Sequence, residues 1–231
     1  MRWKRLTKAA IRMPKDFTNA FTCNTLDKPL NAFLDRFGKL VALADQLLVG
    51  EVVYFIVEES ALLALLKHLK PYASPSGIRV EVLHKSVLHV LGGERGELRF
   101  PQPVGYLTLV DALPSEGEIS EPEYELLRIE NNLPRQGVDF RNEMFLDLGI
   151  DAISFKKGCY LGQEVMARGE EIKHTRKLVR VLYKEVPAIV TVGGEVVGKV
   201  TSSCFSQKYG AFLCFALIKR WEGPIDNGKL V

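Results

Sequence analysis

Residues 157–164 read KGCYLGQE, and this octapeptide governs the interpretation of the rest of the chain. It places a thiol, Cys159, two residues after an ammonium, Lys157, and between two glycines. An amide and a carboxylate, Gln163 and Glu164, close the segment. Glycines let a backbone approach a ligand closely, and a thiol becomes reactive where a positive neighbour favours its thiolate. The segment therefore predicts a functional loop with Cys159 as its reactive group.

The same side chains also have ordinary structural explanations, which the sequence leaves open. Cys159 would then be a buried free thiol, and Tyr160 a core tyrosine instead of a flat partner for a heteroaromatic ring. Gln163 and Glu164 would open a helix instead of binding the edge of such a ring. If the segment is extended, Lys157 and Cys159 point to one face, and the ammonium can act on the thiol.

The composition is that of a globular protein. The 231 residues are 47% hydrophobic and 26% charged, with a net charge of +3, and they can form one to three domains. This mildly basic charge permits an anionic ligand without indicating nucleic acid. No segment reaches the roughly 18 apolar residues of a membrane helix, and no signal peptide is recognisable, so we expect a cytoplasmic protein.

Neither cysteine spacing nor the basic residues define a second site. The four cysteines contain no CxxC pair, so we predict reduced thiols and no metal site. The basic segment 168–184 carries no repeated aromatic residues for base stacking, so direct nucleic-acid binding is not expected. Two explanations of this segment stay open, a solvated loop and an anion-binding site. Its basic residues are Arg168, Lys173, His174, Arg176, Lys177, Arg180 and Lys184.

Apolar periodicity predicts an α+β fold that ends in an all-β module. The β-branched and aromatic run 52–57 predicts a buried strand, and the leucines of 61–69 predict a helix that Pro71 ends. Ser120 is suited to cap a helix over 122–131. The C-terminal part predicts a small barrel or sandwich, because short strands follow one another at 178–186, 188–192, 195–202 and 212–218.

The octapeptide resembles the KGCYxGQE hallmark of the YgfZ family, folate-binding relatives of the glycine cleavage system T protein, which is an aminomethyltransferase. Residues 127–139 and 152–155 resemble the family segments before the hallmark, and 197–203 resembles a turn of its last domain. The resemblance implies a T-protein-like ring of three domains with folate in the central channel. These would be a discontinuous folate-binding core domain (1–50 with 111–175), a small ferredoxin-like α+β domain (51–110) and a C-terminal small β-barrel (176–231).

The N-terminal half departs from the family pattern. Thr25 stands where the family has an aspartate, and residues 145–149 read FLDLG where it has P-x-E-x-G. Asp45 is our candidate for the key catalytic aspartate of the aminomethyltransferase, although the spacing before it is two residues longer. These departures, and a cysteine that the catalytic relatives lack at this place, argue against inherited aminomethyl transfer.

The resemblance implies a tetrahydrofolate-binding protein that acts in iron–sulfur cluster assembly or repair and in a linked tRNA modification. Cys159 would be the reactive thiol or transient ligand, Lys157 would favour its thiolate, and Asp45 would be the catalytic carboxylate. Iron–sulfur proteins or their assembly factors would be the partners of a monomer. The folate would be held by Arg128, Glu130, Tyr160, Gly162, Gln163, Glu164 and Arg168.

Alternatives remain for the helical residues and for the function. Arg128 and Glu130 diverge on a helix, so a solvated charge pair is the ordinary explanation for them. Asp139 suits either a turn or a ligand contact. The chain could instead be a folate-dependent aminomethyltransferase of the glycine cleavage type, or a non-enzymatic interaction scaffold that binds no folate; whether it is an enzyme is left open.

Overall fold

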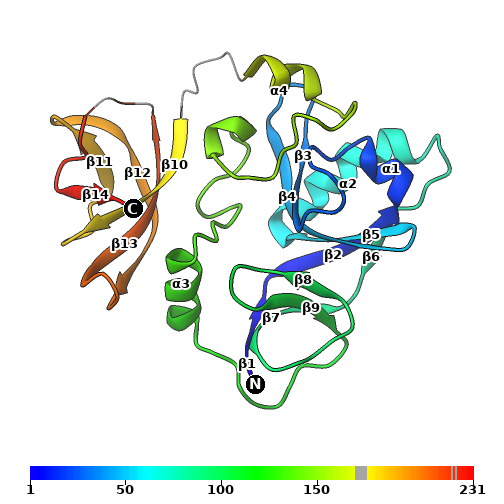
Figure 1. Cartoon of the computed structure of the whole chain (residues 1–231), viewed down its shortest axis with the longest axis horizontal. Coiled ribbons are helices and arrows are strands. Elements are labelled where there is room, and N and C mark those ends of the chain that lie inside the picture. Colours follow the sequence, from blue (N-terminus) through cyan, green and yellow to red (C-terminus); the bar gives the residue numbers. More distant parts are fainter. Residues whose placement is uncertain (170–175, 220, 222) are drawn as a thin grey trace. The chain divides into compact units, whose positions relative to one another are not determined.

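The computed structural model describes residues 1–169, 176–219, 221 and 223–231 (Figure 1). The chain divides into two compact units. Unit 1 comprises Met1–Ile119 with Ile150–Arg168, and unit 2 comprises Ser120–Gly149 with Gly169–Val231. Strands predominate over helices in both, so the α+β prediction is supported with a heavier β content than the sequence pattern implied.

The predicted three-domain ring is not confirmed. Strands of the segment 51–110 are divided between two sheets, one completed by strands before residue 50 and the other by the N-terminal strand. The predicted domain bounds differ from those of the two units and remain a prediction. They are 1–50 with 111–175, 51–110, and 176–231.

The larger sheet of unit 1 is antiparallel, in the strand order β3-β4-β5-β2-β6. The helix α2 packs against three of its strands. A short helix, α1, follows β2. The bounds are β2 (Lys8–Pro14), α1 (Lys15–Asn19), β3 (Leu30–Leu34), β4 (Leu40–Val49), β5 (Val52–Glu58), α2 (Glu59–Ala73) and β6 (Glu81–Leu83).

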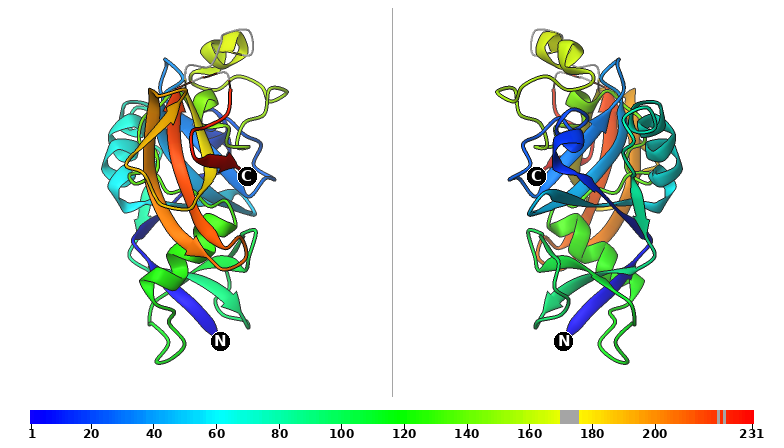
Figure 2. Two further views of the ribbon diagram at one scale, coloured as in Figure 1. Left: turned by 90° about the vertical axis from the view of Figure 1, so that its left-hand side faces the viewer. Right: turned by 90° about the vertical axis from the view of Figure 1, so that its right-hand side faces the viewer.

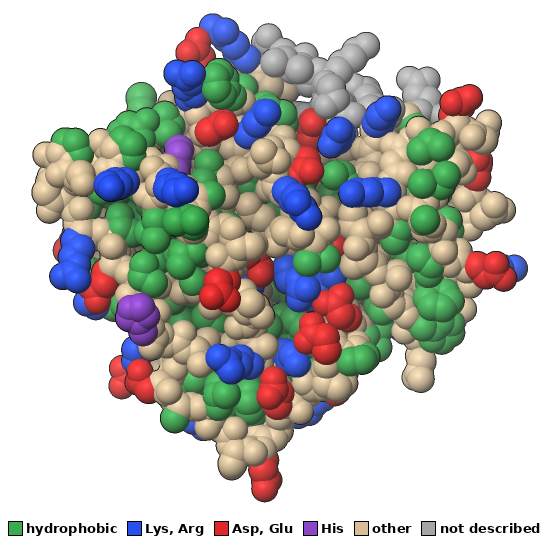
Figure 3. All heavy atoms as spheres, turned by 180° about the vertical axis from the view of Figure 1, so that it is seen from behind, with side chains coloured by type: hydrophobic (Ala, Val, Ile, Leu, Met, Phe, Trp, Pro, Cys, Tyr) green, Lys and Arg blue, Asp and Glu red, His purple; other side chains and the backbone are tan. Residues whose placement is uncertain are grey.

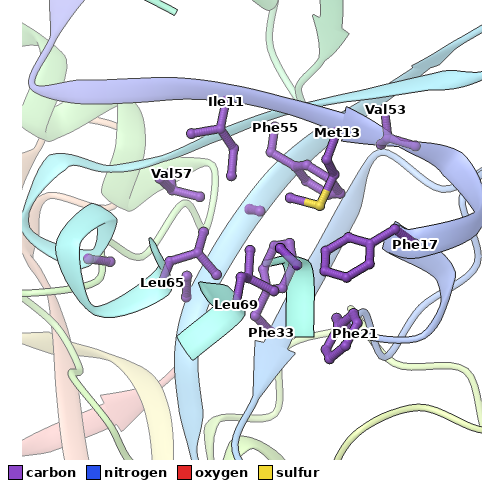
Figure 4. Close-up of a cluster of buried hydrophobic side chains, with 14 residues drawn as sticks. Ile11, Met13, Phe17, Phe21, Phe33, Val53, Phe55, Val57, Leu65 and Leu69 are labelled. Carbon is purple, nitrogen blue, oxygen red and sulfur yellow. The ribbon is translucent and has the colours of Figure 1, made fainter. Parts of the chain in front are cut away.

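Alternation along β5 explains why its apolar run is continuous. Successive side chains of a strand point to opposite faces. Phe55 and Val57 join the cluster under α2, whereas Ile56 joins a cluster on the other face with residues of the second sheet. Figure 4 shows the first cluster, in which Phe55 meets Phe33 edge-on with ring centroids 5.1 Å apart. Both faces of the central strand are therefore buried.

The second sheet of unit 1 has four strands in the order β1-β7-β9-β8. Its pairs are antiparallel, and Trp3 of β1 is buried against β7 and β9. The segment 150–168 completes unit 1 and ends in the helix α4 (Gln163–Gly169). The strands are β1 (Arg2–Leu6), β7 (Ser86–Gly92), β8 (Arg99–Pro101) and β9 (Tyr106–Val110).

Unit 2 is built on a five-stranded antiparallel sheet in the order β11-β12-β13-β10-β14, seen in Figures 1 and 2. The helix α3 packs against β12 and β13. Leu213 and Phe215 of β13 face Ile129 of α3, and Cys214 between them joins the core on the other face. The elements are α3 (Glu121–Glu130), the 3-10 helix η1 (Phe145–Leu148), β10 (Arg176–Tyr183), β11 (Ile189–Val192), β12 (Glu195–Ser206), β13 (Ala211–Lys219) and β14 (Gly228–Leu230).

The predicted C-terminal barrel is an open sheet in the described residues, since no pairing joins its edge strands β11 and β14. The edges are instead bridged at one point by Asp226. Its backbone N–H donates to the carbonyl of Thr191 at 2.9 Å, and its carboxylate accepts from the N–H groups of Gly193 and Gly194. These bonds attach the segment before β14 to β11 and to the turn that follows it.

The prediction that Pro71 ends the helix over 61–69 is wrong. The helix α2 continues through Pro71 to Ala73. Proline removes one backbone donor, and near the end of a helix this leaves a single carbonyl without its partner. Buried residues at spacing four hold this last turn on the sheet, namely Ala61, Leu65, Leu69 and Ala73.

Candidate functional site

The segment that contains the octapeptide lies against residues 19–23 of unit 1 (Figure 1). The backbone N–H of Ser154 donates to the carbonyl of Cys23 at 2.9 Å, and that of Leu161 donates to the carbonyl of Ala20 at 3.1 Å. The thiol of Cys23 is buried and donates to the carbonyl of Ala152 at 3.1 Å. The segment is thus attached on both sides of the octapeptide's cysteine.

Lys157 is buried between these two attachment points. Its Nζ donates to the carbonyl of Asn19 at 2.8 Å, to the hydroxyl of Thr22 at 3.1 Å and to the carbonyl of Thr22. Burial lowers the pKa of Lys157 to about 8, although the nearby thiol of Cys23 opposes this shift. Burial also raises the pKa of Cys23 to about 12, so the neighbouring thiol keeps its proton at neutral pH.

Cys159 is exposed, whereas Lys157 is 8% exposed. The two side chains are expected to share one face only in an extended segment, and the structure does not have that segment extended. The chain turns and bends at residues 155–157, so the alternation of an extended strand does not apply. The roles predicted for the two residues in the reaction remain predictions.

Tyr160 turns back into unit 1 and is 8% exposed. Its ring centroid lies 5.5 Å from Nζ of Lys157, a cation–π arrangement. Burial raises the pKa of its hydroxyl. These contacts are those of the core-tyrosine alternative.

Gly162 needs the freedom of glycine. Its φ is +88°, and a Cβ at this position would lie 2.6 Å from the carbonyl oxygen of Asp35. Gln163 and Glu164 begin α4, as the helix-opening alternative supposes. Glu164 pairs with Arg168 at 2.5 Å, and both side chains are largely exposed. The following Lys173 and His174 lie outside the described residues.

Asp45 lies on β4 in a second polar cluster of unit 1. Its carboxylate accepts from Nζ of Lys8 at 3.1 Å and from Nε2 of Gln102 at 2.7 Å, and the residue is 7% exposed. Lys8 also pairs with Glu58 at 3.5 Å, and burial lowers the pKa of His89 close by. These neighbours of Asp45 could not be found from the sequence, because they come from four other strands or loops.

Arg128 and Glu130 belong to unit 2, where Arg128 is buried and Glu130 is half-buried. Arg128 is 1% exposed and pairs with Glu125 at 2.7 Å and with Asp139 at 2.8 Å. Burial lowers the pKa of Arg128, but its bonds and charge interactions with Glu125 and Asp139 raise it on balance. Glu130 accepts a hydrogen bond from Ser206.

Asp139 is the acceptor at the centre of this network. Besides Arg128 it binds the backbone N–H of Arg135 at 2.8 Å and the hydroxyls of Thr201 and Ser202 of β12. Asp139 thus anchors α3 and β12 within unit 2, and the choice between a turn residue and a ligand contact stays open. The predicted site residues therefore form three groups, around Lys157, around Asp45 and around Arg128.

Among the residues placed by the structure, no three His, Cys, Asp or Glu side chains are grouped as metal ligands. Within the same residues, no helix has both the length and the apolar character to span a bilayer. Figure 3 shows acidic and basic side chains interspersed on one face, as the small net charge implies.

Comparison with known proteins relates the chain to aminomethyltransferases. No protein-family model matches it. An aminomethyltransferase of Symbiobacterium thermophilum is 31% identical over 190 residues, which are 75% of this chain and 50% of that protein. An uncharacterized protein of Haemophilus influenzae is 26% identical over 179 residues, which are 72% of this chain and 64% of that protein. The chain thus spans about half to two thirds of the length of these relatives.

The fold has a close counterpart among solved structures. The crystal structure of glycine cleavage system aminomethyltransferase T from Bartonella henselae matches with a TM-score of 0.75 at 12% identity, covering 96% of this chain and 82% of that chain. At this identity the likeness shows the fold alone, and that fold is the predicted T-protein fold. The chain is thus similar in sequence to an aminomethyltransferase and in fold to the glycine cleavage T protein.

Proposed function

We propose that the chain is a tetrahydrofolate-binding, YgfZ-like protein that acts in iron–sulfur cluster assembly or repair and in the tRNA modification linked to it. The observation that carries this proposal is the exposed thiol of Cys159 on a loop attached at both ends. The other cysteines are buried or half-buried. A thiol held outward is suited to react with a partner or to ligate one transiently. Because clusters need about four protein ligands, a partner would supply the others.

The fold and the relatives support a folate as the ligand, and the accessible polar groups of α4 fit parts of one. Gln163 is half-buried and suits the amide edge of a pterin, and the exposed guanidinium of Arg168 suits the glutamate tail. Arg128 and Glu130 fit less well, because Glu125, Asp139 and Ser206 already bind them. A folate could reach these two only by exchanging those bonds. Bound tetrahydrofolate would supply a carrier of one-carbon units.

The first experiment is an anaerobic calorimetric titration of the whole protein with tetrahydrofolate, beside the Cys159→Ala variant. We expect saturable binding to both, because the thiol is assigned to chemistry or partner contact and not to affinity. No binding to the wild-type protein would contradict the folate proposal and favour the interaction scaffold.

The contact of Arg168 can be tested in the same titration. Arg168→Gln should weaken the binding of a polyglutamylated tetrahydrofolate by roughly tenfold, the loss of one charge-assisted contact. The control is Arg99→Gln, which removes another surface arginine paired with a glutamate, Glu94. Equal effects of the two substitutions would remove Arg168 from the site.

The thiol role is tested in cells that depend on this protein for iron–sulfur enzyme activity. Cys159→Ala should abolish that support while the purified variant keeps the wild-type melting temperature, because an exposed side chain contributes little to stability. Full support by the variant would show that the thiol is dispensable.

Aminomethyl transfer is the second candidate, favoured by the relative from Symbiobacterium thermophilum. Asp45 would then be the catalytic carboxylate. Asp45→Asn should lower glycine-cleavage exchange by roughly 100-fold or more, and Asp111→Asn, an exposed aspartate paired with Lys85, should not. An unmeasurable exchange activity in the wild-type protein would exclude this candidate.

A further inference from the structure

The contacts of Lys157 distinguish two roles that the sequence could not separate. An ammonium has three N–H donors and no acceptor. Lys157 has three oxygen acceptors, the carbonyls of Asn19 and Thr22 and the hydroxyl of Thr22. Its donors are therefore used within residues 19–22, and none remains for Cys159.

The acceptors of Lys157 belong to one short stretch that binds the whole segment. Asn19 is the last residue of α1, and the last carbonyls of a helix have no partner within it. The carbonyl of Ala20 takes the N–H of Leu161, and that of Cys23 takes the N–H of Ser154. Four carbonyls between residues 19 and 23 are thus occupied by Ser154, Lys157 and Leu161.

This attachment explains why Cys159 is outside. Lys157 before it and Tyr160 after it are both buried, while Gly158 and Cys159 between them are exposed. A Cβ added at Gly158 would meet nothing within 4 Å. The thiol of Cys159 is therefore exposed on a short loop, and the residues on both sides of this loop are buried in unit 1.

We propose that Lys157 is a positioning residue, which fastens the segment 154–161 onto residues 19–23 so that Cys159 is presented to its partner, and that it does not activate the thiol. This inference deepens the proposed function, on which the importance of Cys159 rests. The side chain of Lys156, the adjacent exposed lysine, has no part in the attachment.

The test combines amide exchange with thiol reactivity in the purified full chain. In Lys157→Met, the amides of Ser154 and Leu161 should exchange roughly 10- to 100-fold faster, because charge-assisted bonds that hold the segment are lost. Amides of α3 in unit 2 serve as the internal reference. Lys156→Met is the matched control and should leave exchange unchanged, and Lys157→Arg should restore part of the protection.

The second readout is the pH profile of the alkylation of Cys159 by iodoacetamide, followed by peptide mass spectrometry. Its midpoint should stay within a few tenths of a pH unit in Lys157→Met. A rise of about one unit or more would show that Lys157 acts on the thiol electrostatically, and would overturn the proposal. Wild-type exchange rates in Lys157→Met would overturn it as well.

A milder variant covers the case in which Lys157→Met does not fold. Thr22→Val removes one acceptor of Lys157 and leaves its charge in place, and it also removes the hydrogen bond that the Thr22 hydroxyl donates to the carbonyl of Thr18. Thr22→Ser, which keeps both bonds, is the control. Faster exchange at Ser154 and Leu161 with an unchanged alkylation midpoint supports positioning, and unchanged exchange contradicts it. Neither readout needs a folate or a cluster, so a protein that fails to bind folate can still pass this test.

Discussion

Arg128 is the buried charge on which several parts of unit 2 converge. Arg128 lies on α3 and pairs with Glu125 of the same helix and with Asp139. Asp139 in turn accepts hydrogen bonds from the hydroxyls of two residues on β12. Removing one partner of a buried pair leaves the other charge uncompensated, which costs far more than the pair contributes as a whole.

We therefore expect Arg128→Leu to lower the free energy of unfolding of unit 2 by about 3–5 kcal/mol, as measured by urea denaturation. The control is Arg99→Leu, whose partner Glu94 is exposed, and whose loss should cost about 1 kcal/mol or less. A similar small cost for both arginines would show that Asp139 is satisfied by its other donors.

The buried thiol of Cys214 should affect how the free energy of unfolding depends on pH above pH 9. Burial raises its pKa from 9.0 to about 12. Above pH 9 the thiol loses its proton in the unfolded chain but retains it in the folded protein. The contribution of Cys214 to the free energy of unfolding is therefore complete below pH 9 and falls as the pH rises toward 12. The slope that it adds is at most about 1.4 kcal/mol per pH unit.

Cys214→Ala should accordingly flatten the dependence of stability on pH above pH 9, whatever its effect at neutral pH. Urea denaturation at intervals between pH 8 and 10.5 measures the difference in slope between variant and wild type. Parallel curves would mean that the thiol ionises equally in the folded and unfolded states.

The two glycines of the octapeptide loop differ in whether they tolerate a side chain. Gly162→Ala must place a Cβ 2.6 Å from the carbonyl oxygen of Asp35 at a φ of +88°, and we expect a loss of roughly 2–4 kcal/mol. Gly158→Ala meets open space at a φ that other residues adopt, and should change stability by less than about 0.5 kcal/mol. Thermal unfolding of the two variants, side by side, decides this; equal shifts would contradict it.

Elements whose apolar residues are contiguous or regularly spaced were predictable. β5 follows from its β-branched and aromatic run, and α3 follows from Ser120, whose hydroxyl accepts the N–H of Glu123 as a cap. β1 and β2 do not follow from the local pattern, because basic residues interrupt them and their partners, β7 and β5, lie far along the chain. Burial of such strands is decided by pairing, which a local pattern does not contain.

The same limit applies to the candidate site. The octapeptide could be singled out from its own residue types, but the acceptors of Lys157 lie 135 and 138 residues away. The alternation of an extended strand would place Lys157 and Cys159 on one face, but the chain turns and bends at 155–157, so that pattern does not apply. Likewise the buried partner of Arg128, eleven residues away, depends on the loop that returns Asp139 to the helix.

At the scale of the whole molecule, each unit contains its own buried clusters. In unit 1 they lie on both faces of the β5 sheet, and in unit 2 on both faces of β13. Units with separate cores need not unfold in one cooperative step. A destabilising substitution then acts on the transition of the unit that contains it.

We predict two resolvable transitions in calorimetric unfolding, each with its own sensitivity. Gly162→Ala should lower the midpoint of one transition and Arg128→Leu that of the other, because the first strains unit 1 and the second uncovers a charge in unit 2. The double variant should show both shifts with no coupling beyond about 0.5 kcal/mol, as expected of sites without shared partners. A single transition that both substitutions shift would instead mean that the two units unfold as one cooperative body, and the effects of Gly162 and Arg128 on stability could then not be assigned to separate parts of the chain.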